Sequence, residues 1–316
     1  MIRIYSLEEE ELKRDSNLRL IEKIQRLKKE RKAIILAHNY QIGEVQDVAD
    51  YLGDSLGLSR QAAKTNAEVI VFCGVHFMAE TAAILCPDKI VLMPDIDAGC
   101  PMADMIDRER LKVLKRKHPK ATVVSYVNTP AEVKAESDIC CTSANAVKLI
   151  KSLKSQEIIF TPDKYLAHYV ATKTDKRIIP WDGFCPSHVR ILSGDIARRK
   201  KEHPTAEVIV HPECTPEVIK LSDRALSTEG MCKYAKEGSV LEIIVGTEIG
   251  LLHRLRKENP GKKFYSASEL AICPSMKLTT LEKILWSLED MKEQITVPEE
   301  IRVKAKRAID KMLEIS

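Results

Sequence analysis

Short runs of β-branched and aliphatic residues recur along this chain, and helical patterns of apolar and polar positions fall between them. The runs predict strands at 33–37, 68–73, 89–93, 121–127, 156–160, 176–179, 207–211, 241–245 and 262–265. The intervening patterns predict helices, for example over 103–117 and 187–203. Strands that alternate with helices in this way indicate βαβ units and parallel sheets.

Three segments of the chain align with one another without gaps. They are AHNYQIGEVQDVADYLGDS, SYVNTPAEVKAESDICCTS and VHPECTPEVIKLSDRALST, which begin at residues 37, 125 and 210. The columns shared in register include Glu44, Glu132 and Glu217; Asp50, Asp138 and Asp223; Lys89, Lys176 and Lys262; and, each before a proline, Cys100, Cys185 and Cys273. Chance similarity would not keep several columns in register at once, so the chain is predicted to contain three copies of one unit.

The repeat predicts an α/β fold built from three homologous three-layer α/β/α units with short parallel sheets. We expect a pseudo-threefold arrangement around a central cluster, because no single unit is large enough to bury much surface alone. The expected units are 1–105 with an N-terminal helix, 106–190, and 191–316 with a C-terminal helix, and a strand could be exchanged between units. The stretches 6–32 and 299–314 lie outside the repeat and are expected to pack on its outside.

Composition and charge narrow the class of protein. The net charge of +4 is mild and evenly spread, which disfavours a nucleic-acid partner and suits small anionic substrates equally well. No apolar stretch reaches the ~18 residues that a membrane span needs. The N-terminus turns acidic where a secretory signal would be apolar, so the cytoplasm is the expected compartment.

The chain has nine cysteines, and three of them occupy one column of the repeat. With no secretory signal, an odd number disfavours a disulfide framework and favours metal binding or catalysis. Cys100, Cys185 and Cys273 each follow a third strand by several residues. Ligands of open α/β sheets bind beyond the carboxyl ends of the strands, so a pseudo-threefold axis near those ends would bring the three thiols together.

Three thiolates form an incomplete set for a structural zinc ion, which takes four protein ligands. A [4Fe–4S] cluster on three cysteines would leave one iron open to substrate, where it acts as a Lewis acid. The simpler alternative is three buried packing cysteines. The shared register, with each thiol before a proline, favours the metal site.

Polar residues gather after the first strand of each unit. They are His38, Asn39 and Tyr40 in the first unit, Tyr126 and Asn128 in the second, and His211 and Glu213 in the third. These residue types suit proton transfer and hydrogen bonding to carboxylates or carbonyls. A lone histidine would be interpreted as a packing residue, but clusters at matching places in three units favour a functional site.

One further column carries a hydroxyl group before a helical pattern in each unit. Its members are Ser55, Ser143 and Thr228. An N-cap role would explain such residues without any ligand. A helix N-terminus with a hydroxyl also binds phosphate or carboxylate, so the column predicts anion-binding helix starts that face the centre.

Nine short motifs together resemble the quinolinate synthase family. In chain order they are LAHNYQ, DSL, GCPMAD, SYVNT, CCTSANA, GFCPSH, HPEC, STEGM and CPSMK, from about residue 20 to the C-terminus. The resemblance implies three α/β domains in a triangle around a [4Fe–4S] cluster. It also implies the reaction, in which iminoaspartate condenses with dihydroxyacetone phosphate, losing phosphate and two waters, to give quinolinate.

The resemblance further implies a role for each column. The cluster ligands would be Cys100, Cys185 and Cys273. The catalytic group would be Glu213, His211, Tyr40 and Tyr126. The substrate-binding group would be His38, Ser55, Asn128, Ser143 and Thr228. An L-aspartate oxidase or dehydrogenase is implied as a transient partner that supplies iminoaspartate.

Two other classes of function are weighed against this one. The first is a different enzyme, either an iron–sulfur hydro-lyase on another carboxylate substrate or a zinc enzyme with three cysteines. The second is a non-enzymatic iron–sulfur redox sensor. A sensor would need a partner-binding or DNA-binding element, and the proton-transfer residues would then have no use.

Overall fold

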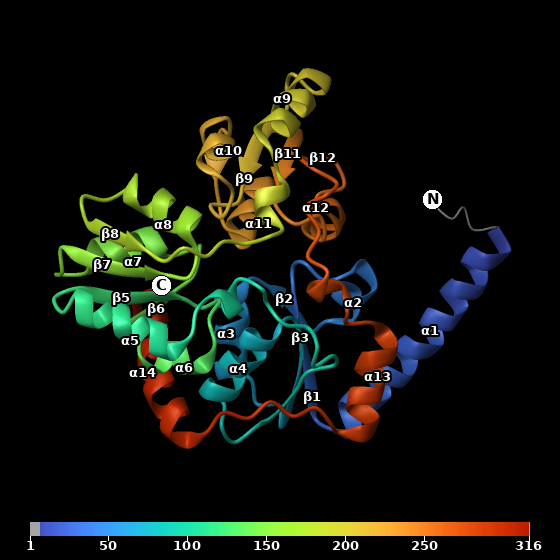
Figure 1. Cartoon of the computed structure of the whole chain (residues 1–316). Helices are drawn as coiled ribbons and strands as arrows, with labels where there is room; N and C mark the ends of the chain where they lie inside the picture. The colour runs from blue at the N-terminus through green and yellow to red at the C-terminus, as the bar shows by residue number, and fades with distance from the viewer. Residues whose placement is uncertain (1–6, 316) are drawn as a thin grey trace.

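The computed structural model describes residues 7–315, with side chains from residue 15 onward, as an α/β protein with three parallel sheets. Figure 1 shows the three sheets as separate bodies, one blue to teal, one green and one yellow to orange, grouped around a common middle. The predicted three-layer α/β/α units are therefore confirmed. Residues 1–6 and 316, which belong to the predicted first and third units, lie outside the described residues.

Each sheet has four strands, and all three sheets share one strand order. The first sheet runs β2 (Tyr51–Gly53), β1 (Ala33–His38), β3 (Val69–Cys73) and β4 (Ile90–Leu92). The second runs β6 (Ile139–Cys141), β5 (Thr122–Tyr126), β7 (Glu157–Thr161) and β8 (Arg177–Pro180). The third runs β10 (Arg224–Ala225), β9 (Glu207–Val210), β11 (Glu242–Gly246) and β12 (Lys263–Ser266). In each sheet the order reverses between the first and third strands, which is where such sheets bind ligands.

The helices follow the same repeated plan. The first unit contains α1 (Leu7–Glu30), α2 (Gly43–Val48), α3 (Ser55–Lys64) and α4 (His76–Leu85). The second contains α5 (Arg108–Lys117), α6 (Ala131–Ala135), α7 (Ala146–Ser152) and α8 (Lys164–Ala171). The third contains α9 (Ser193–Glu202), α10 (Pro216–Lys220), α11 (Thr228–Glu237) and α12 (Leu251–Glu258). In chain order, α1 thus precedes its sheet as α5 and α9 precede theirs.

The nine predicted strands are confirmed with ends within one residue, but each sheet also has a second strand that was not predicted. These strands are only two or three residues long, too short for a hydrophobic pattern to show. The shared aspartates explain why they pair. The carboxylates of Asp50, Asp138 and Asp223 each accept the backbone N–H fifteen residues earlier at 2.8 Å, which holds the start of the second strand against the first.

The predicted helices 103–117 and 187–203 are wrong as continuous elements. Each begins with a 3₁₀ turn, η1 (Ala103–Met105) or η2 (His188–Arg190), and breaks before the α-helix starts. Asp107 ends the first break by capping α5, because its carboxylate accepts the N–H of Arg110 at 2.8 Å. A third turn, η3 (Ser275–Lys277), follows the third Cys-Pro pair.

Two C-terminal helices tie the units together. After η3, α13 (Leu281–Asp290) packs against α1 and β3 of the first unit, and α14 (Glu299–Ile315) packs against α6 and β6 of the second. Figure 1 shows α14 in red beneath the green second sheet and α13 in orange beside α1. The bounds of the three units stay a prediction, and α14, although within the segment 191–316, lies on the second unit.

The largest buried cluster joins the first two units. It includes Phe72, Ile84, Phe160 and Met312, which come from β3, α4, β7 and α14. The other face of the first sheet packs under α1 and α13, and the third sheet has its own clusters on both faces. Of the helices described, none combines the length and the apolar character that crossing a membrane requires.

Candidate active site

A cavity lies where the carboxyl ends of the three sheets meet. The cavity and its opening to solvent together contain about 670 Å³ of space not filled by atoms. All twelve residues predicted for the site line it, namely His38, Tyr40, Ser55, Cys100, Tyr126, Asn128, Ser143, Cys185, His211, Glu213, Thr228 and Cys273. The cavity also takes in Asp54, His188 and Glu248, which sequence reasoning missed. The structure therefore brings the predicted residues together; their individual roles stay predictions.

The Cys-Pro pair is explained by local structure. Each cysteine stands before a short 3₁₀ turn, and the backbone N–H three residues later donates to its sulfur: Ala103 to Cys100, His188 to Cys185 and Met276 to Cys273. Proline suits the first position of such a turn because it has no N–H that would need a partner. Each thiol thus stands before a 3₁₀ turn whose N–H group acts to lower its pKa, although burial outweighs this effect.

The three thiols are close enough to influence one another. Burial first, and neighbouring Cys273 to a smaller extent, raise the pKa of Cys100 to about 12, although the N–H of Ala103 acts to lower it. Burial also raises the pKa of Cys185 well above its usual range, with Glu213 and Cys100 adding to the effect. Buried thiols that disfavour each other's ionisation suit a metal centre, because a metal deprotonates its thiol ligands outright.

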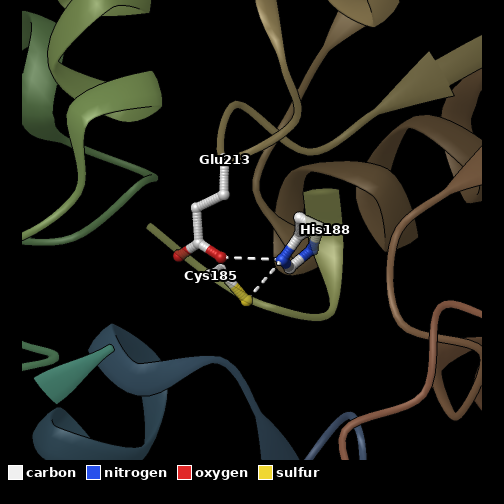
Figure 2. Close-up of side chains that lie close together, drawn as sticks. All are labelled: Cys185, His188 and Glu213. Atoms are coloured by element: carbon white, nitrogen blue, oxygen red, sulfur yellow. Dashed lines mark hydrogen bonds and ion pairs between the residues drawn. The ribbon is translucent and has the colours of Figure 1, made fainter. Parts of the chain in front are cut away.

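His188 lies between Glu213 and Cys185 in a group of polar side chains (Figure 2). Glu213 contacts this histidine through its carboxylate. Its Oε2 is 2.8 Å from Nδ1 of His188, and the same nitrogen is 3.1 Å from Sγ of Cys185. The three ligand-type atoms lie within 4.8 Å of one another, so these residues could hold a metal ion. Ligands around a tetrahedral zinc at ~2.0–2.3 Å would stand about 3.3 Å or more apart. The observed separations are instead those of hydrogen bonds, with the imidazole N–H donating.

A chain of hydrogen bonds connects Glu213 to Tyr40. The hydroxyl of Tyr40 lies 2.5 Å from Oγ1 of Thr247, which lies 2.9 Å from Nε2 of His188. Since Nδ1 of His188 donates to Glu213, a neutral ring accepts at Nε2 from Thr247, and Thr247 accepts from Tyr40. The arrangement offers a path for a proton between the tyrosine and the carboxylate.

The ionisation states follow from burial and neighbours. Burial acts to raise the pKa of Glu213, but His211 and His188 outweigh it and lower the pKa to about 2. Burial lowers the pKa of His211 to about 3, and likewise that of His38. The pKa values of Tyr40 and Tyr126 are raised, first by burial and then by Glu213. At neutral pH the site therefore holds a carboxylate, two neutral imidazoles and two neutral phenols.

The repeated hydroxyl residues Ser55, Ser143 and Thr228, here called the hydroxyl column, line the cavity but do not cap the helices. Ser55 and Thr228 are the first residues of α3 and α11, and the N-caps are the residues before them, Asp54 and Ser227. The side chain of Asp54 accepts the N–H of Gly57 at 2.8 Å, and that of Ser227 accepts the N–H of Gly230 at 3.2 Å. The N-cap interpretation of the column is thus wrong. Ser143 lies ahead of α7, and its hydroxyl is 3.1 Å from Nε2 of His211.

Two asparagines bear on ligand binding, Asn128 in the cavity wall and Asn39 outside it. Oδ1 of Asn128 is buried, and no partner for it is found within the described part of the chain. The side chain of Asn39 donates to Thr228 at 2.9 Å and accepts from Arg254 at 2.9 Å, so it joins the first unit to the third. Asn39 therefore supports the wall, whereas Asn128 has an oxygen left for a ligand.

Acid is expected to destabilise the fold through His38. An unfolded histidine titrates near pH ~6.5, whereas His38 in the folded chain titrates near about 3, so the unfolded state binds more protons between these values. Stability is therefore lost as the pH falls from 6.5 toward 3, by about 2–3 kcal/mol at pH ~4.5 from this group alone.

The measurement is urea unfolding at pH 7.5 and 4.5 for the wild type and His38→Gln. The variant is expected to lose less stability between the two pH values than the wild type. His253→Gln, which removes a partly exposed imidazole, serves as the control. Equal losses in wild type and His38→Gln would contradict the assignment of a neutral buried ring.

Comparison with known proteins matches almost the whole chain. The family model described as "Quinolinate synthetase A protein" matches residues 22–314. A quinolinate synthase from Dehalococcoides mccartyi (strain CBDB1) is 62% identical over 293 residues, which cover 93% of this chain and 97% of the relative. Quinolinate synthases from Methanosarcina barkeri and Geobacter metallireducens are 58% and 56% identical, over 94% and 93% of this chain and 97% of each relative.

Proposed function

The chain belongs to the quinolinate synthetase A protein family, and we propose that it condenses iminoaspartate with dihydroxyacetone phosphate to give quinolinate, phosphate and two waters. The observation that carries the proposal is the cavity, which gathers the predicted thiol, proton-transfer and anion-binding residues. The atoms of the two substrates equal those of the products, with no electrons left over. The reaction therefore needs dehydration and proton transfer but no oxidant.

Cys100, Cys185 and Cys273 would hold a [4Fe–4S] cluster. The donor set fits, because three thiols from three units converge on one cavity and each accepts an N–H at the start of a 3₁₀ turn. A cluster with three protein ligands supplies an open iron, a Lewis acid toward oxygen groups that favours loss of water. The rest of the chemistry falls to the side chains around it.

The hydroxyl column would bind the acidic groups of the substrates. Ser55 and Thr228 open α3 and α11, where unsatisfied backbone N–H groups attract phosphate and carboxylate. Asn128 would hold a further substrate group through its unpartnered Oδ1 or its amide. Neutral His38 would hydrogen-bond to substrate without adding charge.

Glu213 would move protons in the dehydration steps. It is ionised and buried, so it can accept a proton from substrate carbon or oxygen. The chain through His188 and Thr247 then connects it to Tyr40, whose phenol is neutral and can return a proton. His211, 3.7 Å from Glu213, would orient the carboxylate, and Tyr126 would serve as a second phenol beside it.

Iminoaspartate is hydrolysed readily in water, so its source matters to the proposed reaction. An enzyme that oxidises the amine of aspartate, an oxidase or a dehydrogenase, would supply it. A transient partner of this kind fits the reaction, although the cavity itself needs only the two small molecules.

The test is quinolinate formation by protein purified without oxygen. Iminoaspartate is generated in the assay from oxaloacetate and ammonia, and dihydroxyacetone phosphate is the second substrate. We expect quinolinate and phosphate in equal amounts, and no product when dihydroxyacetone replaces its phosphate. Protein with a full complement of iron and sulfide that makes no quinolinate would contradict the proposal and favour a hydro-lyase on another carboxylate.

A further inference from the structure

One position of the repeat faces the loops of the predicted ligand cysteines. It comes two residues after β3, β7 and β11 and is occupied by Val75, Asp163 and Glu248. The next backbone N–H donates to the carbonyl two residues before each cysteine, from His76 to Ala98 at 2.9 Å, from Lys164 to Gly183 at 2.8 Å and from Ile249 to Ala271 at 3.0 Å. The backbone next to this position is therefore held against each cysteine loop.

Glu248 uses both carboxylate oxygens in the third unit. Oε1 accepts a hydrogen bond from the backbone N–H of Cys273 at 3.2 Å and forms an ion pair with Lys277 at 2.8 Å. Oε2 accepts a hydrogen bond from the N–H of Gly250 at 2.7 Å. The side chain is fully buried. A buried carboxylate is stable only when it is paired and hydrogen-bonded in this way.

Lys277 extends the link to the tyrosine of the site. Its ammonium donates to the backbone carbonyl of Tyr40 at 2.5 Å while it pairs with Glu248. Gly250 completes the contact, because a Cβ there would lie 2.7 Å from that carbonyl and 2.8 Å from Oε2 of Glu248. One carboxylate therefore holds the Cys273 loop and, through one lysine, the backbone of Tyr40.

The other units show how specific this arrangement is. In the second unit the carboxyl of Asp163 caps α8 by accepting from Leu166 at 2.6 Å, and the N–H of Cys185 also donates to it. In the first unit the position holds Val75, whose side chain offers no acceptor. A carboxyl group at this position thus accepts the backbone N–H of Cys185 and of Cys273. Cys100 has no such partner at the matching position.

We propose that Glu248 is a positioning residue that fixes the third cluster ligand, Cys273, and sets its distance from Tyr40 through Lys277. The inference rests on the proposed function, since it takes Cys273 as a ligand of the cluster. Outer partners of metal ligands commonly change metal retention by ~10–100-fold when they are removed. A carboxylate paired beside a ligand loop also affects the reduction potential of a cluster.

The replacement Glu248→Gln separates this role from simple packing. Glutamine has the same shape but only one oxygen, whereas donors approach Glu248 from both sides. Its NH₂ group would therefore face either Cys273 and Lys277 or Gly250, donor against donor. Glu248→Asp keeps two oxygens, as the aspartate of the second unit does, and is the conservative variant. Glu269→Gln, on the same loop but exposed, is the matched control.

The experiment follows cluster loss to a chelator and the reduction potential of each anaerobic holoprotein. We expect the cluster of Glu248→Gln to be lost at least about tenfold faster than that of the wild type, with Glu248→Asp in between and Glu269→Gln unchanged. We expect the potential to rise in Glu248→Gln, because a negative charge near the ligand is removed. If Glu248→Gln does not fold, the test becomes the rate of cluster loss in Glu248→Asp. That rate should exceed the rates of the wild type and of Glu269→Gln.

The outcomes are distinct. Wild-type rates and potentials in Glu248→Gln would overturn the positioning role while the proposed function stands. If Glu248→Gln does not fold, a Glu248→Asp protein that loses its cluster at the rate of the control would also overturn the positioning role. Wild-type protein that binds no cluster would overturn the proposed function, and the inference with it.

Discussion

Replacing Glu213 with glutamine is expected to abolish turnover while the cluster stays in place. The amide keeps the size of the side chain and an oxygen for the N–H of His188, 2.8 Å away, but it cannot take a proton from substrate. Loss of a general acid–base group lowers kcat by ~10²–10⁴-fold. The measurement is kcat for quinolinate formation beside iron and sulfide per chain.

Glu217→Gln is the control for this substitution, since Glu217 lies on the neighbouring α10, is exposed and is the glutamate of the repeated column. It should leave both readouts unchanged. Normal turnover in Glu213→Gln would remove the carboxylate from the proton path. Loss of iron in that variant would have a different meaning, because it would place Glu213 among the metal ligands, with Cys185 and His188.

Twelve of the residues that line the central cavity could be predicted because they occupy matching positions in the three repeats. Two of the columns that recur in all three units have the same structural reason in each unit. The aspartates that include Asp50 bind the start of the second strand to the first, and the cysteines precede 3₁₀ turns. An alignment of the chain with itself therefore finds the residues that every unit needs. It also finds the residues that follow matching strands in the three units, and these twelve predicted residues line one cavity.

The residues that break the symmetry were missed for the same reason. His188 stands three residues after its cysteine, where the other units have Ala103 and Met276, and Thr247 stands where the second unit has Pro162. Neither has a counterpart, so no column pointed to them. Their contacts with Tyr40 depend on how the second and third units pack against the first, and the periodicity within one unit carries no information on that packing. Their burial and their hydrogen bonds to each other and to Tyr40 reveal them, and only the folded chain supplies these contacts.

Replacing Cys185 with alanine is expected to remove the cluster and, with it, activity. The three thiols come from three different units, and each is held by its own turn, so no neighbouring residue can take the place of one that is lost. Wild-type protein prepared without oxygen should contain about four iron atoms and four sulfides per chain. The variant should contain almost none, and it should make no quinolinate.

Cys214→Ala is the control that gives this result its meaning. Cys214 is also buried and lies next to Glu213 in sequence, but its sulfur faces the carbonyl of Gly246 at 3.5 Å and does not line the cavity. A cluster bound through Cys100, Cys185 and Cys273 should therefore survive its removal. Zinc in place of iron, or a cluster lost in Cys214→Ala and kept in Cys185→Ala, would contradict the ligand assignment. Because the thiols converge from separate units, the same loss is expected when either of the other two cysteines is replaced, whichever unit supplies it.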